Sequence, residues 1–336
     1  MRTIFGRLGL GLFVLLAIST AGHAQFTYTT NADNTLTITD YSDGSASVTI
    51  PSNFNGKTVT CLGNESFRES YYMTSVSIPS SVTNIGNRAF YLCTNLTGVV
   101  IPNNVIRLGG EAFSECYRLS SLTLGSGMKS IGDQSFHNCT NLLSVALPDG
   151  LTNIGDSAFF GCASMTNLMI GTGLKNLSQF SFKGCSALKS ISIPNNVTNI
   201  GNEAFSGCVS ARNVGIGSGV KAIETGAFID CGALTNASIG GAVVTIGNSA
   251  FYYCTNLASI AIPASVTFID GMAFSNCKNL KNVAIPDNVA ILGFQAFETC
   301  TGLTNISIGA GITIITNGVF GSCSNLKNVA ICNGIK

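Results

Sequence analysis

The chain has 336 residues, of which 46% are apolar and only 10% are charged, and its formal net charge is +1. Its Lys and Arg residues are scattered rather than clustered, so the sequence lacks the basic patch typical of nucleic-acid binding, and we expect no nucleic-acid partner. No run of 18 consecutive apolar residues follows the N-terminal segment, which predicts a mature chain without a membrane span.

Residues 1–24 have the three parts of a secretory signal peptide. Arg2 and Arg7 form a positive start, residues 8–18 form an apolar core, and Gly22-His-Ala24 is a small-residue cleavage site. Removal of this segment takes away both arginines and changes the formal charge from +1 to −1. The sequence therefore predicts an exported protein that is secreted or held at the cell surface.

Residues 25–60 are expected to form an N-terminal β cap. Two segments, Phe26-Thr-Tyr-Thr29 and Thr35-Leu-Thr-Ile-Thr39, alternate apolar and polar residues as half-buried strands do. Ser47-Val-Thr-Ile50 then resembles the strand of the later repeats, with a longer spacer after it. Because the terminal repeats of a solenoid are atypical and cover the open end of its core, we interpret this segment as a cap.

A unit of 23 residues recurs without insertion or deletion from Leu62 to the C-terminus, which gives about 12 repeats in a solenoid over residues 61–336. One slot of the unit holds Phe from Phe67 to Phe320, and another holds Cys from Cys93 to Cys323. Each unit has a Leu-x-x-Val-x-Ile segment, predicted to be a short strand, and a shorter Val-x-x-Ile segment. The Ala-Phe-x-x-Cys-x-x-Leu segment that follows is expected to form one or two helical turns. Stacked units would bury the Phe and Cys ladders between short parallel strands.

The repeated pattern Leu-x-x-Val-x-Ile-Pro-x-x-Val-x-x-Ile-Gly-x-x-Ala-Phe-x-x-Cys resembles that of the BspA-type leucine-rich repeat family over about residues 62–332. The resemblance implies a right-handed leucine-rich-repeat solenoid of a secreted or surface bacterial protein, and several such proteins act in adhesion to host proteins or other cells. Family members share no catalytic residues, so the resemblance implies no enzymatic activity. The chain stops at Ile335-Lys336, part-way into the next repeat, with no visible C-terminal cap or wall anchor.

Thirteen cysteines in an exported protein are typical of a disulfide framework. Eleven of them, however, share one slot, where neighbours lie near the strand spacing of about 4.8 Å, whereas the Cβ atoms of a disulfide lie about 3.5–4.5 Å apart. We therefore favour buried structural thiols over disulfides. Neither CxxC nor a Cys/His pair occurs at zinc-ligand spacing, so we expect no metal. Cys61 and Cys332 lie outside the ladder and are the candidates for reactive thiols.

Catalytic residues are poorly represented in the mature sequence. Its one histidine, His137, occupies a variable outward slot without an evident base or metal partner, and we interpret it as an exposed residue. Carboxylates such as Glu65, Glu111, Glu203 and Glu298 are scattered among the repeats, although their spacing leaves a glycosidase-like pair open. We expect a protein that is not an enzyme and that has no cofactor.

The clearest candidate binding surface lies near the N-terminal end of the solenoid. Tyr71 and Tyr117 share one slot two repeats apart, which places them about 10 Å from each other on one edge. We name the candidate partner-binding residues the Tyr–Arg patch: Tyr71, Tyr72, Tyr91, Tyr117, Arg68, Arg88 and Arg118. Tyr and Arg are enriched at interfaces. The alternative is that these rings only shield the early repeats.

The outward positions of the predicted strands are mostly Ser, Thr, Asn and Ala, which makes a flat face with few anchors for a partner. That face is either a binding surface or a merely solvated one. We predict a protein that binds an extracellular protein or glycan through its solenoid surface, in adhesion. The alternative is a structural spacer that self-associates end to end, because exposed strand edges invite pairing.

Overall fold

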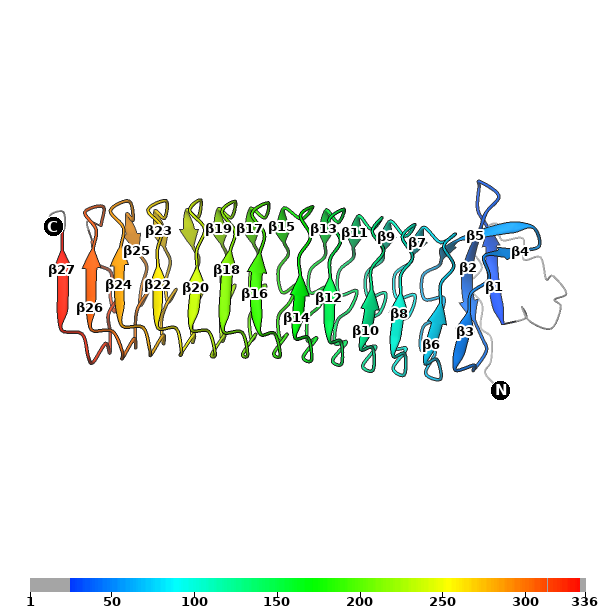
Figure 1. Ribbon diagram of the computed structural model, residues 1–336, viewed down its shortest axis with the longest axis horizontal. Helices are drawn as coiled ribbons and strands as arrows, with labels where there is room; N and C mark the ends of the chain where they lie inside the picture. Colours follow the sequence, from blue (N-terminus) through cyan, green and yellow to red (C-terminus); the bar gives the residue numbers. More distant parts are fainter. Residues whose placement is uncertain (1–24, 313, 333–336) are drawn as a thin grey trace.

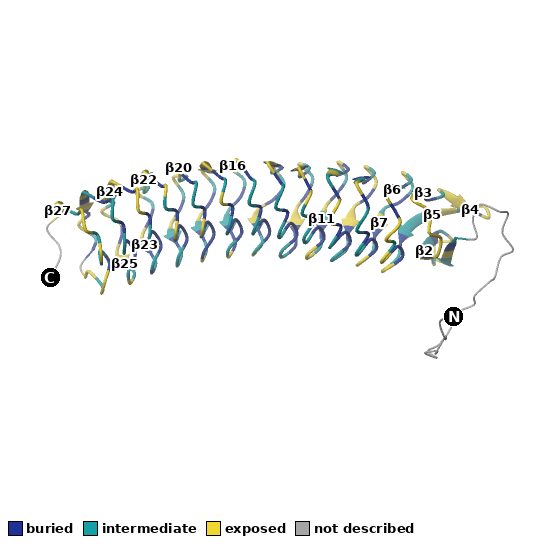
Figure 2. Cartoon of the chain, turned by 90° about the horizontal axis from the view of Figure 1, so that it is seen from below, coloured by how far each residue is buried: buried dark blue, intermediate teal, exposed yellow. Residues whose placement is uncertain are grey.

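The computed structural model describes residues 25–312 and 314–332 of the chain. They form a long, gently curved solenoid whose coils stack in sequence order, with β1 near one end of the rod and β27 at the other (Figures 1 and 2). The predicted repeat solenoid with short parallel strands is therefore confirmed. The predicted signal peptide lies outside the described residues. Within those residues, no helix has the length and apolarity needed to cross a membrane.

The Leu-x-x-Val-x-Ile segments form a first row of strands along one side of the rod. These strands are β3 (Ser47–Thr49), β6 (Ser75–Ser77), β8 (Gly98–Val100), β10 (Ser121–Thr123), β12 (Ser144–Ala146), β14 (Asn167–Met169), β16 (Ser190–Ile193), β18 (Asn213–Ile216), β20 (Asn236–Ser238), β22 (Ser259–Ala261), β24 (Asn282–Ile285), β26 (Asn305–Ile308) and β27 (Asn328–Ile331). They pair in parallel within four sheets, β10-β8-β6-β3, β12-β14, β16-β18-β20-β22 and β24-β26-β27. Val214 pairs with Ala237, for example, so each residue pairs with the one in the same slot of the next repeat.

The Val-x-x-Ile segments form a second row of shorter strands. These are β5 (Lys57–Leu62), β7 (Asn84–Ile85), β9 (Arg107–Leu108), β11 (Ser130–Ile131), β13 (Asn153–Ile154), β15 (Asn176–Leu177), β17 (Asn199–Ile200), β19 (Ala222–Ile223), β21 (Thr245–Ile246), β23 (Phe268–Ile269) and β25 (Ile291–Leu292). From β7 onward the second residue of each strand is buried, while the first faces outward, as the alternation of a strand requires. The aliphatic ladders of both rows thus point into one continuous core.

Residues 25–60 close the N-terminal end of this core. β1 (Phe26–Thr30) pairs antiparallel with β2 (Leu36–Tyr41), and β2 joins β5 in parallel at the end of the second row. β4 (Asn53–Phe54) forms a hairpin with β5. The rings of Phe26 and Tyr41 lie 6.2 and 5.3 Å from the ring of Phe67, the first member of the Phe ladder.

The segment around each ladder Phe is not helical in the described residues, so the prediction of one or two helical turns was wrong. We call the five residues centred on the ladder Phe the Phe turn. In the Phe turn of Phe205, Glu203 and Gly207 adopt left-handed φ angles of 49° and 71°. Left-handed residues at both flanks prevent a helix. The amides of all three residues donate instead to carbonyls of the next coil at 2.8–2.9 Å.

The Phe rings form the centre of the core. Eleven of them, from Phe67 to Phe297, have no exposed surface. The rings of successive coils stack nearly parallel, as in the pairs of Phe205 with Phe182 and Phe228, whose centroids lie 5.3 and 5.6 Å apart. Because each ring contacts the next, the core extends as far as the repeats do.

Replacement of Phe205 with Ala is expected to lower the free energy of unfolding by about 3–5 kcal/mol, because it removes a fully buried ring and leaves a cavity. Urea unfolding followed by circular dichroism measures the change. Phe160→Ala is the matched control, since this ring is partly exposed and should cost much less. Equal losses in the two variants would show that the Phe ladder is not the centre of the core.

Candidate functional site

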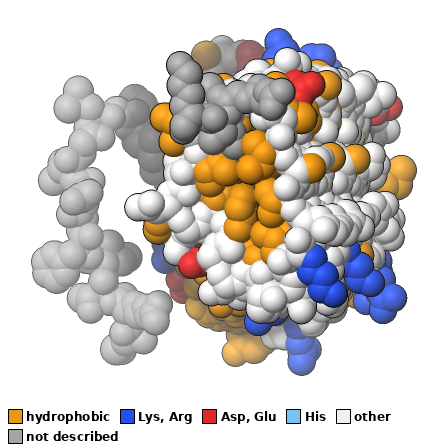
Figure 3. Space-filling model, turned by 90° about the vertical axis from the view of Figure 1, so that its left-hand side faces the viewer, with side chains coloured by type: hydrophobic (Ala, Val, Ile, Leu, Met, Phe, Trp, Pro, Cys, Tyr) orange, Lys and Arg blue, Asp and Glu red, His pale blue; other side chains and the backbone are white. Residues whose placement is uncertain are grey.

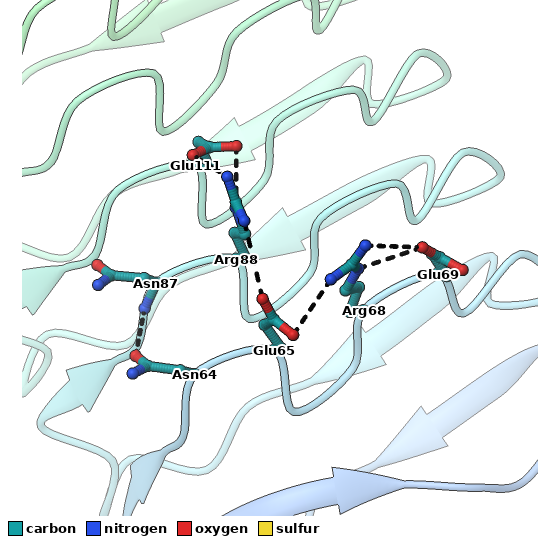
Figure 4. A network of polar contacts seen from close by, with 7 residues as sticks. All are labelled: Asn64, Glu65, Arg68, Glu69, Asn87, Arg88 and Glu111. Carbon is teal, nitrogen blue, oxygen red and sulfur yellow. Dashed lines mark hydrogen bonds and ion pairs between the residues drawn. The ribbon is translucent and has the colours of Figure 1, made fainter. Parts of the chain in front are cut away.

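The Tyr–Arg patch lies on and beside the Phe turns of the first coils, around Phe67, Phe90 and Phe113. Glu65, Arg88 and Glu111 occupy the same slot of three successive coils, so Arg88 lies between two carboxylates (Figure 4). Its Nη2 and Nε atoms lie 2.8 and 3.0 Å from the two carboxylate oxygens of Glu111, and its Nη1 lies 3.9 Å from Glu65 Oε1. These groups are partly exposed, so the pairs orient the guanidinium more than they stabilise the fold.

Arg68 and Tyr91 extend this network. Arg68 forms ion pairs with Glu65 at 3.2 Å and with Glu69 at 3.1 Å. The guanidinium carbons of Arg68 and Arg88 lie 5.6 and 5.7 Å from the centroid of the Tyr91 ring, within the range of cation–π contacts. Tyr91 therefore links the two arginines, and the centre of the patch is held in one geometry.

The remaining tyrosines present their rings to solvent around that centre. Exposed fractions are 44% for Tyr71, 73% for Tyr72 and 42% for Tyr117. A hydrogen bond to the Glu115 carboxylate raises the pKa of Tyr117 to about 12. The Tyr117 hydroxyl thus lies beside the Glu115 carboxylate, while much of the ring stays open to solvent.

The structure thus brings together Arg68, Arg88 and Tyr91, while Tyr72 and Arg118 are exposed and take no part in this described network. The sequence alone did not reveal that Glu65, Glu69 and Glu111 pair with the arginines, or that Glu115 lies beside Tyr117 and His137. Opposite charges in one slot of successive repeats, as in Glu65 and Arg88, are the signal that would have found them. With three arginines and four glutamates, the patch and its partners carry a net charge of −1.

His137 was predicted to be exposed, but in the structure its side chain is partly buried. Its ring stacks on Phe160, which occupies the same slot of the next coil, at 4.8 Å between centroids and 10° between planes. This stacking leaves the side chain only 23% exposed, with Nε2 4.0 Å from Glu115 Oε1. The prediction failed because an outward slot becomes half-buried when the next coil places a large ring beside it.

The ladder cysteines are core residues that also donate hydrogen bonds. Each thiol points to the carbonyl of the Phe 26 residues earlier, as in Cys93 and Phe67 at 3.2 Å between Sγ and O. Burial raises the pKa of Cys93, Cys185 and Cys231 to about 12, which suppresses the reactive thiolate. Outside the ladder, Cys61 is partly buried and Cys332 is exposed. The described part of the chain contains no group of three His, Cys, Asp or Glu side chains that could hold a metal ion.

We expect the free energy of unfolding to fall as the pH rises from about 9 to 12. Burial holds the pKa of the ladder thiols above the value of about 8.5 in an unfolded chain. The stabilisation that these thiols contribute is complete at a pH below their pKa in the unfolded chain. It is lost as the pH rises toward and through their pKa in the folded protein, because the thiols of the unfolded chain lose their protons at a lower pH. Each thiol contributes up to about 1.4 kcal/mol per pH unit in this range.

Urea unfolding at a series of pH values measures this dependence. The double variant Cys185→Ala with Cys231→Ala should show a shallower fall than the unmodified protein. Cys332→Ala, which removes an exposed thiol, is the control and should leave the slope unchanged. The same slope in the double variant and the unmodified protein would contradict the assignment.

Comparisons with known proteins extend over nearly the whole chain. The family model of the BspA type leucine-rich repeat region, six copies long, matches residues 41–132, 60–188, 107–235 and 244–336. The crystal structure of a leucine-rich cell surface protein from Faecalibacterium prausnitzii is similar, with 30% identity, a TM-score of 0.59, and coverage of 94% of this chain and 96% of that one. No curated protein matches the chain in sequence.

Two further crystal structures are similar. A leucine-rich repeat protein from Bacteroides ovatus has 27% identity and a TM-score of 0.58, over 91% of this chain and 92% of that one. The pneumococcal vaccine antigen PcpA has 21% identity and a TM-score of 0.55, over 91% of this chain and 85% of that one, and it supports the fold alone.

Proposed function

Because the chain belongs to the family of BspA-type leucine-rich repeat proteins, we propose that it is a secreted or cell-surface adhesion protein that binds an extracellular protein or glycan through its solenoid surface. The signal-peptide pattern of residues 1–24 supports export. The similarity to a bacterial cell surface protein with 30% identity supports a place at the surface. The proposal includes no catalytic activity.

The Tyr–Arg patch is the observation that carries this proposal. Three Tyr rings are exposed around a centre whose arginines are already held by ion pairs and by the Tyr91 ring. Rigid aromatic side chains supply contact area at a low cost in conformational entropy. Because the net charge of the patch and its paired glutamates is close to zero, affinity would come from the rings more than from long-range attraction. These features fit a protein partner.

The double variant Tyr71→Ala with Tyr117→Ala tests the patch. We expect it to bind an extracellular-matrix protein at least about tenfold more weakly than the unmodified mature protein, since aromatic anchors dominate interface energies. Surface plasmon resonance on immobilised fibronectin, fibrinogen, laminin and collagen measures the affinities. Tyr252→Ala with Tyr253→Ala is the matched control, because these paired rings lie far along the solenoid. Binding that survives in the first variant, or falls equally in both, would rule out the patch.

A second candidate function is that of a structural spacer that self-associates end to end. It is favoured by the apolar side chains at the C-terminal end of the described solenoid, where Ile314, Val329 and Ile331 are 68%, 45% and 52% exposed (Figure 3). Strand β27 is the last strand of its sheet within the described residues, and an outer strand of this kind can pair with another. Size-exclusion chromatography with light scattering should show oligomers that grow with protein concentration. A monomer at every concentration would exclude this candidate.

A further inference from the structure

A polar groove of about 1060 Å³ runs along the solenoid beside the second row of strands. One side is formed by the outward residues of three successive strands, and the other by the first residues of the Phe turns. The side chains concerned are Asn84, Arg107 and Ser130 on the first side and Glu65, Arg88 and Glu111 on the second. Although it shares Arg88 with the Tyr–Arg patch, the groove contains none of the patch tyrosines.

The floor of the groove is a ladder of Asn and Asp side chains that is interrupted at one coil. Asn64 Oδ1 accepts the backbone N–H of Asn87 at 2.8 Å (Figure 4). Asn87 Oδ1 in turn accepts the backbone N–H of Gly110 at 2.8 Å. Gly110 has no side chain to continue the ladder. The backbone N–H of the next member, Asp133, has no hydrogen-bond partner within the described residues, and it is the one amide of this stretch of the ladder that is left free, whereas several amides of the same slot beyond the groove are also free. The floor is hollow at Gly110 and offers a free donor there.

The backbone leaves more room for a side chain at position 110 than at position 109. A Cβ atom at Gly109 would lie 2.5 Å from the backbone nitrogen of Asn87, so the approach of successive coils requires glycine at that position. A Cβ atom at Gly110 would meet nothing closer than the Asp133 carbonyl oxygen at 3.3 Å, and the φ angle of Gly110 lies outside the left-handed region. The same slot holds Asn or Asp in the adjoining coils. The effect of Gly110 is therefore to leave space in the groove.

The groups around this space are polar and nearly balanced in charge. Arg88 and Arg107 face Glu65, Glu111 and Asp133, which gives a net charge of −1. The lining also includes three apolar residues, Ile85, Leu108 and Ile131. Each is at most 1% exposed, so they offer a ligand almost no contact area. A peptide would find no pocket for an apolar anchor, and a polyanion would meet no excess of positive charge. A hydroxyl group both donates and accepts, so it can match carboxylate, amide, guanidinium and free N–H groups together.

We propose that this groove is a binding site for a neutral oligosaccharide, with one sugar ring seated in the space above Gly110. The hydroxyls of that ring accept the Asp133 N–H and the Arg107 guanidinium and donate to the Asp133 carboxylate. The rest of the ligand lies along the axis of the rod, where successive coils about 4.8 Å apart repeat the same polar slots. The inference rests on the proposed function in one respect, that an exported solenoid meets extracellular glycans.

Isothermal titration calorimetry of the mature protein tests the site, with cellohexaose, maltohexaose, xylohexaose and mannohexaose as neutral probes and a heparin hexasaccharide as the acidic probe. We expect at least one neutral hexasaccharide to bind. Gly110→Asn should weaken that binding at least about tenfold, because the new side chain fills the space and takes the Asp133 N–H. Gly271→Asn makes the same change in the same slot outside the groove and should leave the affinity unchanged.

A second variant guards against a folding defect. In Arg107→Ser, the exposed Arg107 is replaced by serine, the residue that the next coil already has in the same slot at Ser130, so the variant should fold. It should also weaken binding about tenfold. The proposal is overturned if no neutral hexasaccharide binds, if only the heparin hexasaccharide binds, or if both variants bind as the unmodified protein does. A loss of matrix-protein binding in the Tyr71 and Tyr117 variant, with no hexasaccharide bound, would leave the proposed function standing and remove the groove alone.

Discussion

The fold depends on the contact between the Phe turn of one coil and that of the next. Phe205 makes this contact in three ways, since its ring stacks on two neighbours, its amide donates to Ala227 and its carbonyl accepts the thiol of Cys231 at 3.4 Å. No 23-residue coil can enclose a core by itself, so each coil is stable only through such contacts with its neighbours. The repeat therefore tolerates variation at outward positions and little variation at the Phe slot.

The period and the apolar slots predicted the ladders and both rows of strands, because burial selects the same residue types in every coil. The Phe turn was mispredicted since an Ala-Phe-x-x-Cys-x-x-Leu spacing suits a helix as well as a turn. The signal for the turn lay in the slot two residues after Phe, where Gly, Asn or Asp recurs in half of the twelve coils, as in Gly207 and Asn276. Such residues tolerate left-handed φ at low cost. Leu92 and Tyr253 also adopt left-handed φ angles, although bulky side chains make this conformation costly. The hydrogen bonds that their amides donate to the next coil offset this cost.

The position of the Tyr–Arg patch also followed from the slots, but its contacts did not. Spacing places Arg88 on the surface without saying where a long, flexible side chain points. The ion pairs with Glu65 and Glu111 depend on the same slot in the coils on either side, and so does the stacking of His137 on Phe160. Gly110 shows the same dependence in reverse, because a missing side chain in one coil leaves space beside the unpaired Asp133 amide of the next. Recognition surfaces in this solenoid are therefore set by pairs of successive repeats, not by single ones.

Amide hydrogen exchange in the central Phe turns tests the dependence on coil-to-coil contacts most directly. The amides of Phe182, Phe205 and Phe228 donate to the next coil at 2.8–2.9 Å, although they lie in turns rather than strands. We expect them to exchange as slowly as the strand amide of Val214, because both are released only when neighbouring coils separate. Exchange at the rate of an exposed turn amide would show that the Phe turns do not hold the coils together.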